Sequence, residues 1–274
     1  MLGAIIGDIA GSRFEGFGHF SIKTKNFELL SAERGCEPTD DSVMTLAIAK
    51  AILTCNDDYS QLEDNAVKYM QQLGRRYSDV GYGGYFYKWI FTENPQPYYS
   101  FGNGAAMRVS PCGFAARTLE EAISLSQAVT RVTHNHPEGM KAAEAVTVAI
   151  FLAKNGKSIP EIRKYVEKNY YKIDFTLDKI RSTYRFDVTC QGSVPQAFEA
   201  FFESTGFEDA IRNAISIGGD SDTIAAITGG MAEAYYGIPS VIREKALLFL
   251  TYDLEAILND FENKYGKFSE ENHG

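Results

Sequence analysis

The spacing of apolar positions along the chain is mostly helical. Segments rich in Ala, Leu and Ile at 42–54, 139–154 and 223–236 each follow a polar cluster, as helices do. A last long helix is expected over 240–263, where apolar residues share one face: Leu247, Leu250, Leu254, Ile257 and Phe261. Alternation with a period of two is scarce. The pattern therefore predicts an all-α domain with irregular connections.

Small residues cluster in two helices, one at 3–11 and the other at 225–234 within the expected helix 223–236, and both clusters contain several Gly and Ala. Glycine lowers helix propensity by about 1 kcal/mol per residue. We expect these two helices to pack backbone against backbone, a contact that large side chains would prevent. Ser158, Pro160 and Glu161 predict the start of a shorter helix. The polar stretch 154–190 is interpreted as a surface segment within one domain, not as a domain boundary.

Composition and charge narrow the class of protein. Of 274 residues, 45% are hydrophobic and 23% charged, which is typical of a globular chain. The net charge of −9 disfavours nucleic acid, because phosphate binding depends on Lys and Arg. Four widely spaced cysteines without a CxxC pair predict free thiols and a cytoplasmic location. The N-terminus does not resemble a signal peptide, and no apolar run is long enough to span a membrane.

Two acidic clusters precede predicted helices: Thr39-Asp40-Asp41-Ser42 and Asp220-Ser221-Asp222-Thr223. Thr, Asp and Ser are the usual caps of helix N-termini, so each cluster alone is explained by capping. Together they supply more carboxylates than caps require. If the two helix starts converge, the carboxylates repel one another unless a cation neutralises them. Their oxygen atoms suit Mg²⁺, Mn²⁺ or Ca²⁺ better than Zn²⁺.

Glu15 is a third acidic candidate. On a helix through 4–15, Asp8 and Glu15 lie seven residues apart on one face, and Gly11 between them would leave room for a ligand. The alternative is a partly exposed glutamate at a helix end.

The segment 101–111 is a loop of small residues, in which Asn103 and Gly104 could present backbone N–H groups to phosphate oxygens. A plain Asn-Gly turn is the alternative. His134 and His136 form an H-x-H pair, but no third His or matching Cys is near enough in sequence to favour zinc. A substrate hydrogen bond or a structural role fits this pair better.

In order along the chain, these motifs resemble the ADP-ribosylglycohydrolase family. The matching segments are Gly7-Asp8, Gly11-Ser12, Glu15, Thr39-Asp40-Asp41, Asn103 to Arg108, Thr133-His134 and Gly218 to Thr223. Each motif alone is weak, whereas the ordered set is specific. The resemblance implies a compact single-domain orthogonal helical bundle over residues 1–274.

The resemblance also implies a chemistry: a hydrolase that releases ADP-ribose at a dinuclear centre of two Mg²⁺, or of Mn²⁺. The implied metal ligands are Thr39, Asp40, Asp41, Asp220, Asp222 and Thr223. Glu15 would lie beside the metals, and Glu15, Asp40 and Asp41 are the candidate catalytic carboxylates. The resemblance further implies that the loop residues Asn103, Gly104, Ala105 and Met107 contact the diphosphate side of ADP-ribose. His134 would contact a ribose of the same substrate.

The expected partner is an ADP-ribosylated protein or a small ADP-ribose conjugate. Neither a membrane nor a nucleic acid is expected as a partner, and the chain is expected to act as a monomer. Two other functions stay open at this point. One is a non-catalytic ADP-ribose-binding or toxin-immunity module. The other is a different two-metal hydrolase of nucleotides or phosphoesters. The motifs do not identify the bond that is cleaved.

Overall fold

A computed structural model describes residues 1–15 and 22–266 of the chain, and in these ranges it contains helices and no β-strand. A single isolated bridge joins Gly102 to Thr189. The prediction of an all-α fold is therefore confirmed. No helix in the described ranges has the length and apolar character that crossing a membrane requires.

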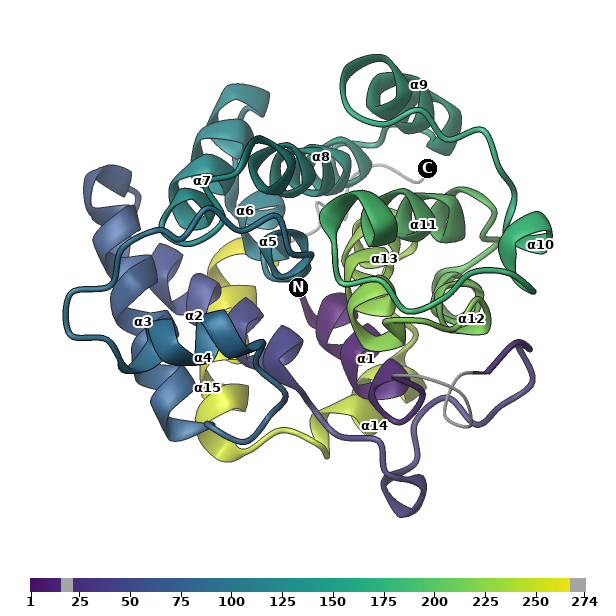
Figure 1. The fold of residues 1–274 in the computed structure, drawn as a ribbon, viewed down its shortest axis with the longest axis horizontal. Helices are drawn as coiled ribbons and strands as arrows, with labels where there is room; N and C mark the ends of the chain where they lie inside the picture. Colours follow the sequence, from purple (N-terminus) through teal and green to yellow (C-terminus); the bar gives the residue numbers. More distant parts are fainter. Residues whose placement is uncertain (16–21, 267–274) are drawn as a thin grey trace.

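The helices (Figure 1) have the following bounds in chain order: α1 Leu2–Ser12, η1 Ala32–Arg34, α2 Asp40–Cys55, η2 Tyr59–Gln61, α3 Leu62–Arg76, α4 Gly84–Phe91, α5 Gly104–Met107, α6 Ser110–Ala115, α7 Leu119–Arg131, α8 Pro137–Lys154, α9 Ile159–Asn169, α10 Leu177–Ile180, α11 Cys190–Phe202, α12 Phe207–Ser216, α13 Ser221–Tyr236, α14 Ser240–Leu247 and α15 Tyr252–Tyr265. The predicted helices at 42–54, 139–154 and 223–236 correspond to α2, α8 and α13. The predicted start at Ser158 is also confirmed, because Ser158 and Glu161 form a capping box at α9.

At the centre of the molecule, α1 packs directly on α13 (Figure 1). The contact uses glycine at successive turns of α1. A Cβ on Gly3 would lie 2.3 Å from the carbonyl oxygen of Gly229, and a Cβ on Gly7 would lie 2.0 Å from that of Ala225. The two small-residue helices therefore do approach backbone to backbone, as the sequence predicts.

Gly7→Ala is expected to destabilise the protein by about 3 kcal/mol, the upper end of the usual range for overpacking, because the three nearest neighbours of the new methyl group are backbone atoms. Gly206→Ala is the control, since no atom lies within 4 Å of its Cβ position and its φ of 177° is extended. Chemical denaturation of both variants measures the difference. Equal unfolding free energies would contradict the close contact.

Around this pair, the other helices place the two acidic clusters at one site. In Figure 1, α2 lies beside α1 and is covered by α3 and α15, while α8 and α11 cover α13 on another side. Both α2 and α13 are buried over most of their length. Their first residues carry the two acidic clusters, and α1 contacts both helices.

Two predicted helix boundaries are wrong. The helix expected over 240–263 is two helices, α14 and α15, because the chain tightens into i→i−3 bonds at Leu248 and Phe249. Thr251 then takes an extended conformation and starts α15. The helix expected over 4–15 ends at Ser12, where the N–H of Phe14 bonds to the oxygen of Gly11. Glu15 therefore follows the helix instead of lying on it.

Candidate metal and ligand site

Asp8 on α1 organises the start of α2. One carboxylate oxygen of Asp8 accepts from the backbone N–H of Thr39 at 2.8 Å and of Ser42 at 3.0 Å. The Thr39 hydroxyl donates to the other oxygen at 2.6 Å, and the Ser42 hydroxyl also donates to Asp8. These are bonds that an N-cap side chain of the same helix normally makes. Asp8 therefore caps α2 from another helix.

The start of α13 is set by two glycines. Gly218 and Gly219 have φ of 67° and 83°, in the left-handed region that glycine tolerates best. The chain turns there so that Asp220 precedes the first turn of α13, and the Ser221 hydroxyl donates to the oxygen of Gly11 at 3.1 Å. A Cβ on Gly11 would lie 2.5 Å from the Cα of Asp222. The space at Gly11 is therefore filled by α13, and the expectation that it makes room for a ligand is wrong.

The capping explanation of the acidic clusters can be tested at the two N-cap residues. Thr39 is the N-cap of α2 and Asp220 the N-cap of α13, yet neither side chain makes a capping hydrogen bond. Thr39 instead donates to Asp8, and Asp220 accepts from the side-chain amide of Asn103 at 2.6 Å. Capping therefore does not account for either side chain.

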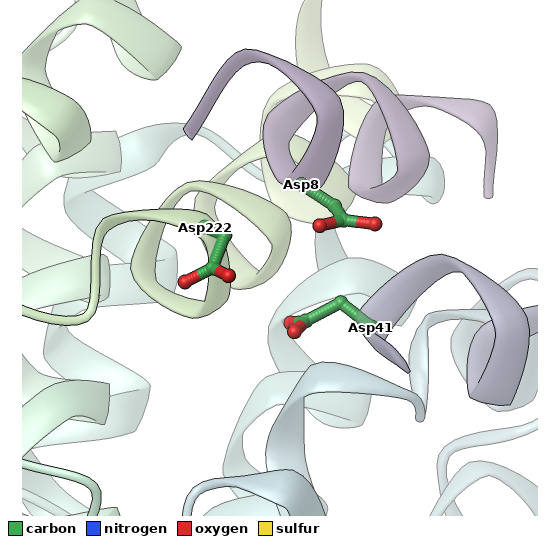
Figure 2. Close-up of side chains that lie close together, drawn as sticks. All are labelled: Asp8, Asp41 and Asp222. Carbon is green, nitrogen blue, oxygen red and sulfur yellow. The ribbon is translucent and has the colours of Figure 1, made fainter. Parts of the chain in front are cut away.

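The carboxylates of the two clusters meet. Figure 2 shows the side chains of Asp8, Asp41 and Asp222 pointing toward one another from α1, α2 and α13. One oxygen from each lies within 4.8 Å of the others. A second group with the same spacing consists of Glu15, Asp220 and Asp222. The two groups share Asp222, so they adjoin one another in a single carboxylate cluster.

This cluster has unusual electrostatics, because Asp8, Asp41, Asp220 and Asp222 are all at most 4% exposed. Within residues 1–15 and 22–266, no lysine or arginine forms an ion pair with any of them. Burial, followed by repulsion from neighbouring carboxylates, raises the pKa of Asp41 and Asp222 well above the ordinary value. Such a group of charges needs either protons or cations to be stable.

Asp41 fits a cation best. Its Oδ2 accepts from the hydroxyl of Thr223 at 3.2 Å, but its Oδ1 is buried and has no hydrogen-bond partner. A buried carboxylate oxygen without a donor is costly unless an ion occupies the remaining position. All the converging atoms are carboxylate or hydroxyl oxygens, the ligands that hard divalent cations prefer. The residues present therefore fit a metal of this kind.

The free energy of unfolding of the metal-free protein should fall as the pH rises from about 4 to about 6. Burial raises the pKa of Asp8 from 3.8 to about 6, so the folded state holds this proton more tightly than the unfolded state. The resulting stabilisation is complete below about pH 4 and is lost above about pH 6, on the order of 3 kcal/mol for this group. The pKa of the proposed ligands Asp41 and Asp222 is also raised, so protons compete with a cation for these carboxylates at low pH. Mg²⁺ should therefore raise the melting temperature far more at about pH 8 than at about pH 5. Thermal unfolding with chelator and with Mg²⁺ measures this, and equal shifts at both pH values would contradict it.

A cavity of about 550 Å³ opens beside the carboxylates. Most of the site residues expected from sequence line it: Glu15, Asp40, Asp41, Asn103, Gly104, Met107, His134, Asp220, Asp222 and Thr223. In the described part of the chain, Thr39 and Ala105 are the two that do not. Thr39 turns its hydroxyl to Asp8, and Ala105 is fully buried with its N–H bonded to Gly102.

Asn103 has a different role from the one its loop suggested. Its backbone N–H donates to the oxygen of Val188 at 2.8 Å, so this group is not presented to a phosphate. Its side-chain amide donates to Asp220 at 2.6 Å and to Ser193 at 3.0 Å. Asn103 therefore holds a carboxylate of the cluster in place.

Asn103→Ala is expected to weaken Mg²⁺ binding about tenfold, because removal of a partner that orients a metal ligand typically has this effect. Calorimetric titration with Mg²⁺ measures it. The control is Asn213→Ala, which removes a buried amide that donates to Ala200 outside the cavity-lining set. Unchanged Mg²⁺ affinity in Asn103→Ala would show that Asp220 needs no such support.

The two histidines of the H-x-H pair have different positions and contacts. His134 is buried and lines the cavity, whereas His136 accepts from the N–H of Glu138 and caps α8. In the described ranges, the residue groups spaced for a metal consist of carboxylates alone.

Sequence reasoning missed two kinds of site residue. Asp8 was noted for its spacing from Glu15 and within the Gly7-Asp8 motif but was not named as a site residue, although an acid within an otherwise apolar helix was a signal of a buried carboxylate. Aromatic side chains also line the cavity: Tyr85, Phe86, Tyr98, Tyr99 and Phe101. Tyr98, Tyr99 and Phe101 directly precede the Asn103 loop, so the sequence already placed them beside a candidate site.

Several known proteins are similar to this chain. ADP-ribosylhydrolase ARH3 of Xenopus tropicalis is 27% identical, and the match covers 86% of each chain. ADP-ribosylarginine hydrolase Tri1 of Pseudomonas putida is 25% identical over 87% of this chain and 70% of its own. The ADP-ribosyl-[dinitrogen reductase] glycohydrolase of Rhodospirillum rubrum is 26% identical over 74% of this chain and 70% of its own.

The fold has a counterpart among solved structures. A chain described as an ADP-ribosylglycohydrolase-related protein complex superposes with a TM-score of 0.66 at 23% identity, covering 96% of this chain and 95% of that one. The sequence profile of ADP-ribosylglycohydrolase matches residues 1–269. The chain belongs to the ADP-ribosylglycohydrolase family.

Proposed function

We propose that this protein is a Mg²⁺-dependent hydrolase that releases ADP-ribose from ADP-ribosylated side chains or other ADP-ribose conjugates. The observation that carries the proposal is the convergence of Glu15, Asp41, Asp220 and Asp222, which belong to two adjoining carboxylate groups and line one cavity with His134. The bond cleaved is the glycosidic bond at the anomeric carbon of the ribose. Family membership and the names of the relatives support the same class of reaction.

The proposed metal ligands are Thr39, Asp40, Asp41, Asp220, Asp222 and Thr223, holding two Mg²⁺ ions for which Mn²⁺ could substitute. When bound, the ions supply positive charge that neutralises the cluster and orients the hydroxyl groups of a ribose. Asp8 is left out of this set. Its two oxygens already accept four hydrogen bonds from Thr39 and Ser42, so its role is to orient the start of α2.

Glu15 is the proposed catalytic carboxylate. It is spaced with Asp220 and Asp222 at the edge of the cavity, and it is exposed where the aspartates are buried. In the structure, burial and the charge of Asp220 raise the pKa of Glu15, and a neighbouring cation would reverse that shift. A charged Glu15 can then accept a proton from the attacking water or orient it. Asp40 and Asp41 are the alternative bases.

The cavity suits ADP-ribose in size and chemistry. Its volume of about 550 Å³ lies within the range of ligand pockets. Tyr85, Tyr99 and Phe101 are 78%, 60% and 43% exposed and offer flat faces to a nucleobase. The Asn103–Met107 loop is the proposed neighbour of the diphosphate, with Gly104 at the first position of α5 and Met107 lining the cavity. In an acidic protein, bound cations would offset the charge of that diphosphate.

The test is incubation of the Mg²⁺-loaded protein with conjugates of ADP-ribose on arginine, on serine, as an acetyl ester and on a nucleic-acid end. Release of free ADP-ribose from one of them, and its loss in excess chelator, is the expected result. Release of phosphate would instead favour a phosphoester hydrolase. Binding of ADP-ribose without turnover of any conjugate would favour a non-catalytic module. We propose further that the protein acts as a monomer in the cytoplasm.

A further inference from the structure

Arg108, which directly follows α5, is a buried cation with no carboxylate partner. It is 1% exposed, and in the described ranges none of its contacts is an ion pair. Its Nη2 donates to the hydroxyl of Thr133 at 2.6 Å and lies 3.4 Å from Nδ1 of His134. Its guanidinium also lies over the ring of Phe86, 5.5 Å from the ring centre. Burying an unpaired guanidinium is unfavourable, so its position calls for a role.

The hydrogen bonds from Arg108 have a fixed direction. A guanidinium only donates, so the oxygen of Thr133 must accept from it. The hydroxyl proton of Thr133 then has two acceptors within reach, Nδ1 of His134 at 2.7 Å and the oxygen of Thr130 at 3.5 Å. The first is an ordinary hydrogen-bond length and the second is at the limit. The hydroxyl therefore donates to Nδ1, which must carry a lone pair and no proton.

A neutral imidazole that accepts at Nδ1 carries its proton at Nε2. The ring is neutral because burial and the charge of Arg108 lower the pKa of His134 well below its ordinary value. Nε2 lies beside the glycine loop: a Cβ built on Gly104 or Gly102 would be 3.5 or 3.7 Å from it. His134 and both glycines line the cavity, so Nε2–H lies where a ligand would bind.

We propose that Arg108 and Thr133 are positioning residues that hold His134 as its Nε2–H tautomer, a hydrogen-bond donor to an acceptor oxygen of the ligand. The tautomer follows from the contacts of these three residues alone. The identity of the acceptor, an oxygen of ADP-ribose, rests on the proposed function. A ribose hydroxyl can serve as this acceptor while it donates its own proton elsewhere.

The first test is nitrogen NMR of the Mg²⁺-loaded protein labelled with ¹⁵N-histidine. The chain has four histidines, so His134→Gln and His136→Asn suffice to assign the two signals of interest. His134 is expected to show a pyridine-type Nδ1 and a pyrrole-type Nε2 from about pH 6 to 8. Saturation with ADP-ribose should shift the Nε2–H proton. A proton found on Nδ1, or an Nε2–H signal unaffected by bound ADP-ribose, would overturn the proposal.

Thr133→Val removes the donor to Nδ1 with little change in size. The Nδ1 signal of His134 should move toward that of a free lone pair, and ADP-ribose should bind roughly three- to tenfold more weakly. Thr133→Ser should restore both. His136 is the internal control, because its Nδ1 accepts from the backbone of Glu138 and should not change. An unchanged His134 Nδ1 signal in folded Thr133→Val would remove Thr133 from the assignment.

Arg108→Gln tests whether Arg108 sets the direction of these hydrogen bonds. The glutamine amide oxygen can accept a hydrogen bond from the Thr133 hydroxyl, whereas a guanidinium can only donate. A second population with the proton on Nδ1 is expected, whereas Arg108→Lys should keep the original tautomer. A single Nε2–H tautomer in Arg108→Gln would show that Arg108 does not set it. If the wild-type tautomer is as stated but ADP-ribose fails to bind, the proposed function fails and the positioning assignment stands.

Discussion

Asp41→Asn is expected to lower the rate of ADP-ribose release by about 1,000-fold or more while leaving the metal-free protein at least as stable as the unchanged chain. The rate should fall beyond the tenfold to 100-fold typical of residues that only orient a ligand, because Asp41 supplies a proposed metal ligand. Burial and the charge of Asp8 raise the pKa of the Asp41 carboxyl, which means that a negative charge is unfavourable at this position. The substitution removes that charge, so the stability of the metal-free protein should hold. Asparagine is also nearly the same size.

The measurement pairs initial rates in Mg²⁺ with thermal unfolding in chelator. Asp64→Asn is the matched control, since Asp64 also lies in the first turn of a helix, α3, but is exposed. A retained rate in Asp41→Asn would mean that Asp41 serves only the helix start. A retained rate together with lost stability would mean the same.

Glu15→Gln is expected to lower kcat by about 100-fold or more, the scale of general-base catalysis, with little change in the binding of Mg²⁺ or ADP-ribose. The substitution keeps the size and much of the hydrogen bonding of the side chain, but it removes the charge that accepts a proton. Glu15 is exposed at the cavity edge, so the substitution should leave the stability of the fold unchanged.

Calorimetry of ADP-ribose binding and a single-turnover assay separate the two effects. Glu33→Gln, an exposed glutamate in η1, is the control for loss of one negative charge. Weaker ADP-ribose binding with an unchanged single-turnover rate would show that Glu15 only holds the ligand. The proton would then pass to Asp40 or Asp41.

Local sequence predicted several helices and the acidic residues at two helix starts because these depend on neighbours a few residues away, whereas α3, α7, α11 and α12 were not among the expected helices. The apolar period identifies α2, α8 and α13, and glycine at successive turns identifies the contact between α1 and α13. The same reasoning was wrong at the break between α14 and α15. There, Thr251 and Asp253 form a helix start that the apolar spacing alone conceals.

Partners distant in sequence could not be predicted in this way. The four hydrogen bonds to Asp8 come from a helix that starts more than 30 residues later, and the amide of Asn103 reaches Asp220 across 117 residues. Both side chains carry polar groups that suit several roles, so only tertiary structure distinguishes them. The direction of the hydrogen bonds from Arg108 through Thr133 to His134 likewise depends on tertiary contacts.

The central pairing of α1 with α13 has a consequence for synthesis of the chain. Gly11 and Ser221 are 210 residues apart, so at about 5 to 20 residues per second α13 follows α1 from the ribosome after about 10 to 40 s. During that interval the apolar surface of α1, buried from Leu2 to Gly11 in the finished fold, lacks its partner. The apolar face of α1 therefore stays without its packing partner for most of synthesis, and the shared carboxylate cluster cannot form before Asp222 is made.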